Sequence, residues 1–132
     1  MTKILITGAS GFLGSNILKI LKPDNEVIGG YCEFSIPEEK TVQLNLYNTS
    51  SIARILNKFS PDIIIHTAAF SKPGLCKKHP DKAATINITA TRKIAEWCQT
   101  NSAQLIFTST DLVYSGNNPK YKEKDTPHPI NK

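Results

Sequence analysis

The sequence lacks the long apolar run and the cysteine pattern that would place it in a membrane or an oxidising compartment. Its 132 residues contain no stretch of 18 consecutive apolar residues, so we expect no transmembrane helix. The three cysteines, Cys32, Cys76 and Cys98, lie far apart and form neither a Cys-x-x-Cys pair nor a metal-binding spacing. We therefore expect reduced thiols, no metal site and a cytoplasmic protein.

The first residues also lack the features of a secretory signal. They have no basic segment, apolar core or cleavage site, because Gly8 and Ser10 interrupt the apolar run. The sequence has no internal repeat and no low-complexity segment, and its length fits one domain. We expect a single NAD(P)-binding domain over residues 1–132, with 115–132 as a polar loop or tail.

Acidic residues are scarcer than basic ones, with 11 Asp and Glu against 16 Lys and Arg and a formal net charge of +5. The lysines cluster in two places, but no aromatic platform or recognition-helix pattern accompanies them. We therefore expect no nucleic-acid partner, and interpret the clusters as a solvated basic surface that favours an anionic nucleotide. The clusters are Lys72, Lys77, Lys78 and Lys82, then Lys120, Lys122 and Lys124.

The most informative feature that is present is a glycine loop between an apolar strand and a helix. Gly8, Gly11 and Gly14 follow an expected strand at 3–7 and open an expected helix at 12–22. In a Rossmann-type fold, the first glycine permits the turn, the second lets a pyrophosphate approach the backbone, and the third lets the helix pack closely. The helix N-terminus adds N–H groups and partial positive charge. The alternative is an ordinary strand–turn–helix connection.

Strands and helices alternate along the chain, which predicts an α/β Rossmann-type, doubly wound parallel sheet with five strands in the order 3-2-1-4-5. The ligand crevice of such a sheet lies between the first and fourth strands, beyond their carboxyl ends. In the first helix, one apolar face is expected to contain Leu13, Ile17, Ile20 and Leu21. We expect further strands at 26–31, 41–45, 63–67 and 104–109. We also expect a helix that Ser50 or Ser51 caps and that runs to about 59, a loop at 70–82 and a long helix at about 81–100.

The end of the second strand bears on the cofactor. Tyr31 and Cys32 stand there, with Glu33 just beyond. No clean carboxylate is present for a ribose 2′-hydroxyl, and no arginine for a 2′-phosphate. NADP and NAD both stay open, with NADP favoured by the missing acid and the basic surface.

Other strand ends supply further candidates. Asn45 follows the third strand, where its amide can face either an adenine edge or solvent. His66 is expected to be a packed, hydrogen-bonded histidine rather than a catalytic one. Ala68 and Ala69 are small where backbone must approach a ligand. Asn87 lies on the inward face of the long helix and needs a partner such as a strand-end backbone group.

The fifth strand ends in Ser109, Thr110 and Asp111. A hydroxyl there can hydrogen-bond a substrate carbonyl or alcohol and polarise it for hydride transfer. A plain capping role for the same residues is the alternative.

These segments, taken in order, resemble the extended short-chain dehydrogenase/reductases of the NAD-dependent epimerase/dehydratase superfamily, which act largely on nucleotide sugars. The Ser-Thr-Asp triplet followed by Val-Tyr is similar to the dTDP-4-dehydrorhamnose reductase branch. That branch also includes a non-catalytic relative, the regulatory β subunit of methionine adenosyltransferase. The matching segments are Thr7–Gly14, Pro61–Ala69, the helix of Asn87, Ser109–Gly116 and Tyr121–Pro129.

The resemblance implies NADP or NAD as cofactor and a nucleotide-sugar substrate. The glycine loop would bind the pyrophosphate, and Ala68 to Phe70 would flank the nucleotide ribose. Thr110 corresponds to the hydroxyl that assists a catalytic tyrosine. The candidate cofactor-binding residues are Gly8, Ser10, Gly11, Phe12, Leu13, Gly14, Tyr31, Asn45, Leu46, Ala68, Ala69, Phe70, Asn87 and Ser109.

The chain departs from the family in lacking its Tyr-x-x-x-Lys pair. In the family the lysine lowers the tyrosine's pKa. The tyrosine needs this, since a free tyrosine with a pKa of ~10 is a poor acid–base group at neutral pH. Here Tyr114 and Tyr121 are followed four residues later by Asn118 and Asp125. The family places its tyrosine just beyond Lys132, so the chain resembles the N-terminal part of a reductase, truncated before the later strands and the substrate domain.

Three functions follow from this resemblance. The leading one is an NAD(P)-dependent reductase of a nucleotide-linked 4-keto sugar, inactive or nearly so as the chain stands. The alternatives are an epimerase or dehydratase of the same family, and a non-catalytic dinucleotide-binding or regulatory module. The fifth strand, with Leu105, Ile106 and Phe107, would form an exposed apolar edge, which predicts low stability or self-association.

Overall fold

Five parallel strands form the centre of the computed structural model, which describes residues 1–38, 40–117 and 120–130. Their order is β3-β2-β1-β4-β5, so the predicted topology is confirmed. The strand order reverses between β1 and β4, as expected. The strands are β1 (Lys3–Thr7), β2 (Glu26–Tyr31), β3 (Thr41–Gln43), β4 (Ile63–His66) and β5 (Gln104–Phe107).

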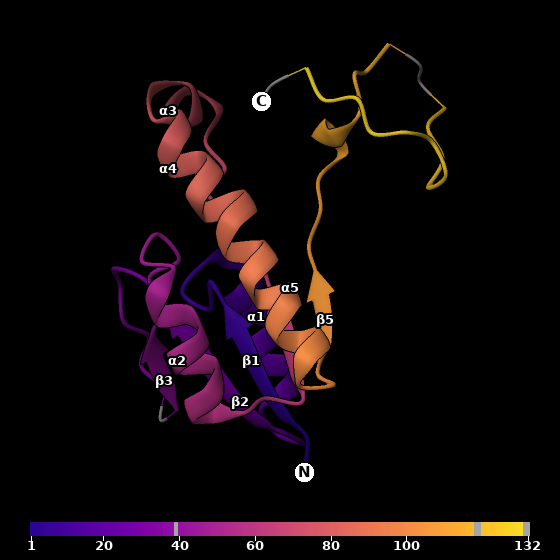
Figure 1. Cartoon of the computed structure of the whole chain (residues 1–132). Coiled ribbons are helices and arrows are strands. Elements are labelled where there is room, and N and C mark those ends of the chain that lie inside the picture. The colour runs from indigo at the N-terminus through magenta and orange to yellow at the C-terminus, as the bar shows by residue number, and fades with distance from the viewer. Residues whose placement is uncertain (39, 118–119, 131–132) are drawn as a thin grey trace.

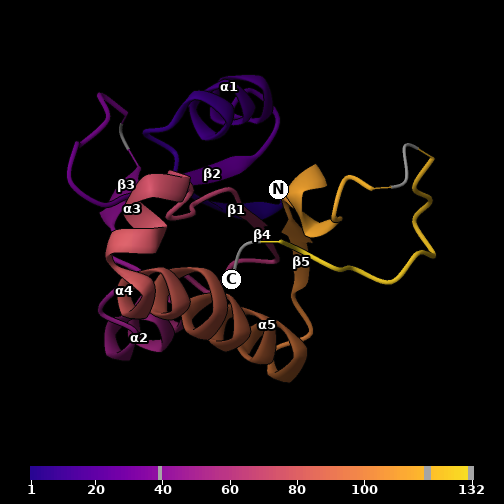
Figure 2. The same cartoon turned by 90° about the horizontal axis from the view of Figure 1, so that it is seen from above.

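The helices lie on both faces of this sheet, as the view from above shows (Figure 2). On one face lies α1 (Phe12–Leu21), and on the other lie α2 (Ser50–Phe59) and a long helix. The long helix runs through α4 (Pro80–Ala84), the π-helical turn η1 (Thr85–Ala90) and α5 (Thr91–Thr100). Beyond the carboxyl ends of the strands stands α3 (Pro73–Lys78), and the 3-10 turn η2 (Asp111–Val113) follows β5 (Figure 1).

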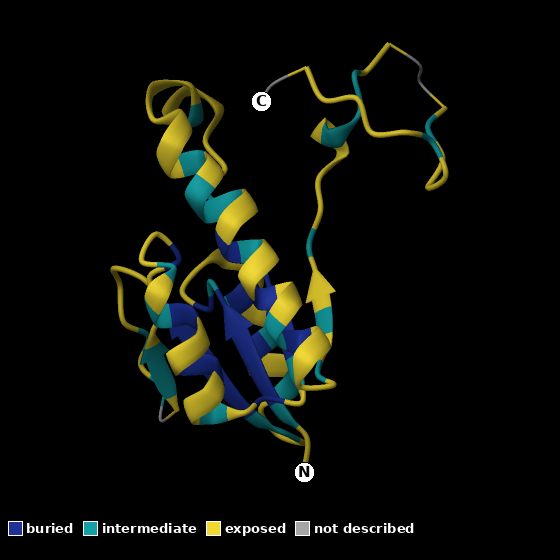
Figure 3. Ribbon diagram, viewed as in Figure 1, coloured by how far each residue is buried: buried dark blue, intermediate teal, exposed yellow. Residues whose placement is uncertain are grey.

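Two buried apolar clusters hold the helices to the sheet (Figure 3). The central strands read as continuous apolar runs because helices cover both of their faces. Each fully buried Leu or Ile stabilises the fold by roughly 1.5–3 kcal/mol, so the larger cluster dominates. It joins the sheet to α2 and α5 through Leu5, Ile28, Leu44, Leu46, Ile52, Ile55, Leu56, Ile64, Ala90, Ile94 and Cys98. The smaller one, beneath α1, contains Ile4, Ile6, Ala9, Leu18, Val27 and Ile65.

The helices differ from the prediction in three places. The segment 70–82 is not a loop, because Pro73 and Pro80 each open a short helix at a position where a missing N–H costs nothing. Neither Ser50 nor Ser51 caps α2, which already includes both. In α1 the buried residues are Gly14 and Leu18, because the helix turns this side toward the sheet.

Two residues expected on the inward face of α1 are therefore exposed. Leu13 is 47% exposed and Ile20 is 72% exposed. Three strands also end earlier than predicted, at Gln43, His66 and Phe107, because the chain leaves the ladder where its residues enter loops at the carboxyl edge.

The outer edge of β5 is open, because β5 is the last strand in the sheet order, and the residues after it stand away from the sheet (Figure 1). Ile106 and Phe107 are 45% and 53% exposed, so the predicted apolar edge is confirmed. Residues 115–117 and 120–130 contain no helix or strand, as expected of a tail. Asn118 and Lys132, named above for the Tyr-x-x-x-Lys spacing, lie outside the described residues. Within the described residues, no helix combines the length and the apolar character needed to cross a membrane.

Candidate functional site

The glycine loop turns sharply between β1 and α1 at the carboxyl edge of the sheet. Gly8 has a φ of +70°, in the left-handed region that favours glycine. A Cβ on Gly8 would lie 2.9 Å from the backbone nitrogen of Ala68, at the end of β4. A Cβ on Gly14 would collide with the carbonyl oxygen of Gly8, so α1 packs directly on the loop. Both glycines are therefore required by close backbone approach, as the motif predicts.

Gly11 leaves an open approach to the start of α1. It stands immediately before the helix in an extended conformation, with φ −82° and ψ 170°, and is exposed. Its N–H donates to the Gly8 carbonyl at 2.9 Å, which closes the turn. The first turn of α1 has no acidic residue and no side-chain cap, so its backbone N–H groups are available to an anion.

Beneath the loop, Thr7 and His66 join β1 to β4 through their side chains. Thr7 Oγ1 lies 2.6 Å from His66 Nδ1, and His66 Nε2 lies 3.0 Å from Thr91 Oγ1 at the start of α5. Burial lowers the pKa of His66 from 6.5 to about 4, so the imidazole is neutral at neutral pH. His66 is thus packed and hydrogen-bonded, as the sequence predicts.

The segment after β4 is held by Asn87. The Phe70 N–H donates to Asn87 Oδ1 at 2.8 Å, and Asn87 Nδ2 donates to the Phe70 carbonyl at 3.0 Å. The Cys76 thiol donates to the same carbonyl at 3.0 Å. The predicted bond from Asn87 to a strand-end backbone group is confirmed, and η1 is the turn that presents this side chain.

A lysine and two aromatic rings lie at this same edge. Lys82 Nζ is 5.3 Å from the ring centroid of Phe70 and 5.9 Å from that of Tyr47, within reach of cation–π attraction. The sequence shows Lys82 as part of a basic cluster, but its two aromatic neighbours cannot be read from it, because Tyr47, Phe70 and Lys82 come from three separate segments.

The remaining nucleotide candidates differ in how accessible they are. Tyr31 is half-buried at the end of β2, and Asn45 is exposed, with its Oδ1 accepting from the Tyr47 N–H at 3.0 Å. Leu46 belongs to the core at 5% exposure, which leaves its backbone rather than its side chain for a ligand. Ala69 is exposed and Ala68 half-buried beside the glycine loop.

The segment between β5 and η2, which contains Ser109 and Thr110, stands away from the glycine loop (Figure 1). Thr110 Oγ1 accepts from the Leu112 N–H at 3.2 Å and donates to Asp111 Oδ1 at 3.2 Å. These contacts cap η2, which is the alternative role that the sequence left open. Ser109 and Thr110 are both exposed.

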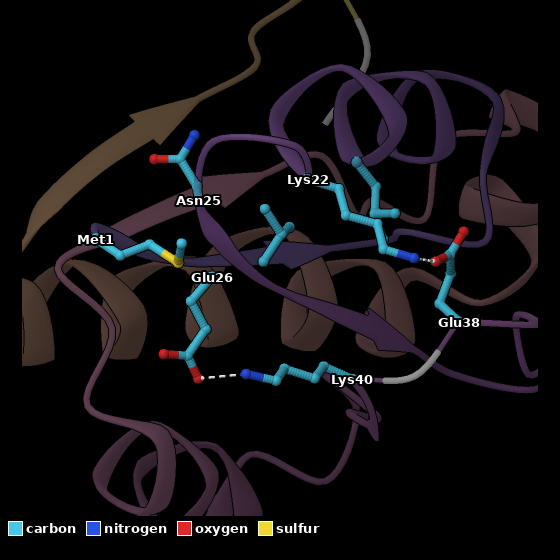
Figure 4. A pocket seen from close by; sticks show the side chains of 8 residues that line it. Met1, Lys22, Asn25, Glu26, Glu38 and Lys40 are labelled. Atoms are coloured by element: carbon cyan, nitrogen blue, oxygen red, sulfur yellow. Dashed lines mark hydrogen bonds and ion pairs between the residues drawn. The ribbon is translucent and has the colours of Figure 1, made fainter.

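A surface hollow of about 210 Å³ lies at the opposite end of the sheet (Figure 4). Two ion pairs cross it, Lys22–Glu38 at 2.8 Å and Lys40–Glu26 at 3.1 Å. Ligands of doubly wound sheets bind beyond the carboxyl ends of the strands, so the candidate site lies at the glycine-loop end and not at this hollow. The hollow is lined by Met1, Leu18, Lys22, Asn25, Glu26, Val27, Glu38 and Lys40.

The described residues hold no group of three or more His, Cys, Asp or Glu side chains placed to bind a metal ion. At the carboxyl edge, the groups described above that a ligand could meet are backbone N–H groups, hydroxyls and the Lys82 ammonium. Such groups suit a phosphorylated organic ligand.

The chain is similar to a methionine adenosyltransferase subunit and to dTDP-4-dehydrorhamnose reductases. Methionine adenosyltransferase 2 subunit beta of Bos taurus is 36% identical over 129 residues, which cover 98% of this chain and 38% of that protein. The crystal structure of a hypothetical dTDP-4-dehydrorhamnose reductase from Sulfolobus tokodaii superposes with a TM-score of 0.92 at 35% identity, covering 98% of this chain and 47% of that one.

A third relative was solved with a cofactor. The dTDP-4-dehydrorhamnose reductase of Bacillus anthracis, in complex with NADP, superposes with a TM-score of 0.83 at 31% identity, covering 99% of this chain and 45% of that one. The chain thus spans less than half the length of these three relatives. The family described as RmlD substrate binding domain matches residues 1–132. Since that match runs through the entire sequence, the chain belongs to the RmlD substrate binding domain family.

Proposed function

We propose that this chain is the dinucleotide-binding part of a dTDP-4-dehydrorhamnose reductase-like protein and binds NADP or NAD at its glycine loop. The observation that carries the proposal is the close-packed turn from Gly8 to Gly14, which leaves the start of α1 open to an anion. The NADP held by the Bacillus anthracis relative supports it. Such a protein, with its three free cysteines, would work in the cytoplasm.

The residues present fit a dinucleotide along the carboxyl edge. The glycine loop, with Ser10, Phe12 and Leu13, would face the pyrophosphate. Ala68, Ala69 and Phe70 would flank a ribose, because two of them are small and their backbone lies beside the loop. Tyr31, Asn45 and the backbone of Leu46 would border the adenine end, and Asn87 would act by holding Phe70.

The choice between NADP and NAD depends on the residues after β2. Tyr31 and Cys32 offer no carboxylate for a ribose 2′-hydroxyl, and the net charge of +5 favours the additional phosphate. Glu33, which is exposed just beyond, would oppose that phosphate. We propose NADP as the preferred form, and a titration of both cofactors decides between them.

A bound NADPH or NADH would provide the hydride for reduction of the carbonyl of a nucleotide-linked 4-keto sugar. From this chain, the exposed Thr110 hydroxyl, with Ser109 beside it, would assist by hydrogen bonding at the reacting oxygen. No tyrosine in the sequence is followed by lysine four residues later. We therefore propose that the 132-residue chain alone binds cofactor without turnover.

The test is a titration of the folded chain with NADPH and NADH, followed by nicotinamide fluorescence. Gly11→Asp should abolish binding while preserving the fold, because aspartate is a favoured residue at a helix N-cap but repels a pyrophosphate. Gly74→Asp is the matched control, since it adds the same charge where a Cβ meets no atom within 4 Å. Saturable binding that only Gly11→Asp removes supports the proposal. A folded chain that binds neither cofactor overturns it.

A regulatory module is the second candidate, favoured by the 36% identity to a methionine adenosyltransferase subunit. An epimerase or dehydratase of the same superfamily is the third. All three would bind a dinucleotide, so turnover separates them. With a protein of the relatives' full length and a dTDP-linked 4-keto sugar, a reductase consumes NADPH. An epimerase or dehydratase changes a nucleotide sugar without net consumption, and a regulatory module does neither.

A further inference from the structure

The residues that β1 and β4 pair with each other change from apolar to polar at the carboxyl edge of the sheet. One layer below the edge, Leu5 faces Ile64, and both are apolar and fully buried. At the edge itself Thr7 faces His66, and each is only 1% exposed. A buried hydroxyl and imidazole are costly unless they are hydrogen-bonded, whereas an apolar pair would pack here as it does one layer below.

Every polar atom of this pair is used. Thr7 Oγ1 accepts from the Ala68 N–H at 3.2 Å, and its own proton can then be donated to His66 Nδ1 at 2.6 Å. That arrangement leaves Nε2 of the neutral ring as the donor to Thr91 Oγ1 at 3.0 Å. The result is a continuous chain of hydrogen bonds from the end of β4 through β1 to α5.

This hydrogen-bond chain acts on the backbone that forms the proposed cofactor site. The chain of hydrogen bonds begins at the Ala68 N–H. The backbone of Ala68 is also what a Cβ on residue 8 would meet, so only glycine fits there. A second hydroxyl, that of Thr67, donates to the Thr7 carbonyl at 2.7 Å, one residue before Gly8. At its other end, Thr91 directly follows η1, the turn that carries Asn87 and through it Phe70.

We propose that Thr7 and His66 are positioning residues for the dinucleotide, which hold the glycine loop against the Ala68–Phe70 segment at the separation that the cofactor needs. This inference rests on the proposed function. The two residues touch no ligand. They set the distance between the two walls that do, one on β1 and one on β4.

The test compares Thr7→Val with Thr7→Ser and with Thr108→Val. Valine at position 7 keeps the shape but leaves the Ala68 N–H and His66 Nδ1 without their partner, whereas serine keeps the hydroxyl. Thr108→Val removes a hydroxyl of the same kind, which donates to the His66 carbonyl at 3.0 Å, but the Thr108 N–H still reaches that oxygen at 3.2 Å. It therefore controls for the loss of one strand-end hydrogen bond.

We expect Thr7→Val to weaken dinucleotide binding by roughly tenfold or more, the effect of a buried donor left unpaired. Thr7→Ser should restore binding to within about threefold, and Thr108→Val should bind like the unchanged chain. Thermal unfolding of the three unliganded variants shows whether the losses merely follow stability. A loss in Thr7→Val no greater than in Thr108→Val of equal melting temperature overturns the inference.

A second readout does not depend on cofactor binding. In the unliganded chain, amide hydrogen exchange at Gly8, Ala68 and Phe70 should accelerate in Thr7→Val and stay unchanged in Thr108→Val. Unchanged exchange at these amides in Thr7→Val overturns the inference. If the unchanged chain binds no dinucleotide while these amides still respond, the proposed function fails and the positioning of the two walls stands.

Discussion

The carboxyl edge of the sheet has a half that is held from several sides and a half whose contacts are local. Around Gly8, hydrogen bonds join β1 to β4, β4 to α5, and the segment after β4 to η1. Among the described residues from Thr110 onward, the hydrogen bonds join the segment to itself, from the Tyr114 hydroxyl to the Lys122 carbonyl and from the His128 N–H to the Val113 carbonyl. Figure 1 shows that second half standing away from the sheet.

This difference separates binding from catalysis within the chain. The parts proposed to hold a dinucleotide are tied together by strands that pair over their full length. The segment with Thr110, proposed to assist the chemistry, is ordered by its own turn. Changes in the first half should therefore reach the whole fold, and changes in the second should stay local.

The largest effect should come from Gly14→Ala, which breaks the tightly held half. The added Cβ would meet the backbone of Gly8 and Ala9, neither of which can move without displacing the loop. We expect the free energy of unfolding to fall by roughly 3 kcal/mol or more, the upper range for overpacking. Urea denaturation measures it, with Gly74→Ala as the control at a position where a Cβ meets nothing. Equal midpoints for the two variants would contradict the close packing of α1.

Acid should weaken the same half by way of His66. Its pKa is lowered from 6.5 to about 4 by burial, so between these values the unfolded chain binds a proton that the folded chain does not. Stability contributed by this group is therefore present above pH 6.5 and is lost as the pH falls toward 4, by on the order of 3 kcal/mol. Titration of the His66 ring by NMR, alongside urea denaturation across this range, measures both. A ring that titrates near 6.5 in the folded chain would be inconsistent with this account.

Ile106→Lys should act on association rather than on stability. Ile106 is 45% exposed on the β5 edge, where a lysine discourages pairing with another strand. We expect the unchanged chain to gain mass with concentration in sedimentation velocity, and Ile106→Lys to remain monomeric, with the free energy of unfolding changed by about 0.5 kcal/mol or less. Ile20→Lys, on exposed α1, adds the same charge elsewhere and should leave association intact. A monomeric unchanged chain at all concentrations would remove the basis of this prediction.

Tyr114→Ala should have the smallest effect on the fold. The Tyr114 ring stacks on Tyr121 with centroids 4.5 Å apart, within the locally ordered half. Global stability should change by about 0.5 kcal/mol or less, while amide exchange at residues 112–117 and 120–128 accelerates. If urea denaturation instead shows a loss comparable to that of Gly14→Ala, the two halves are not independent.

The central strands were predictable because their apolar runs are directly followed by residues that end them. Gly8 marks the end of β1, and Pro61 with Asp62 marks the start of β4. With the strand positions known, the strand order of a doubly wound sheet gives the position of the crevice. The long helix was predictable from its inward face, but its π-helical turn at Thr85–Ala90 was not, because no residue type marks such a turn.

The short helices and the polar contacts were harder to predict for physical reasons. Pro73 and Pro80 end helices and also open them, and only the structure shows which role each plays. Alternation along β4 predicts that His66 is buried, but its partners come from the register with β1 and from the approach of α5, which local sequence does not encode. The sequence feature that pointed to this contact was Thr7, a polar residue that directly precedes the glycine motif.

The pairing of β1 with β4 also has a consequence for how the chain acquires its shape. The hydrogen bond between Thr7 and His66 joins residues 59 positions apart, so the chain must close a long loop before β1 and β4 can pair. Contacts of such sequence separation are associated with slow folding. We therefore expect the glycine loop, whose walls come from both strands, to mature late in folding. A newly made chain would hold its helices and β1–β2 before it can hold a dinucleotide.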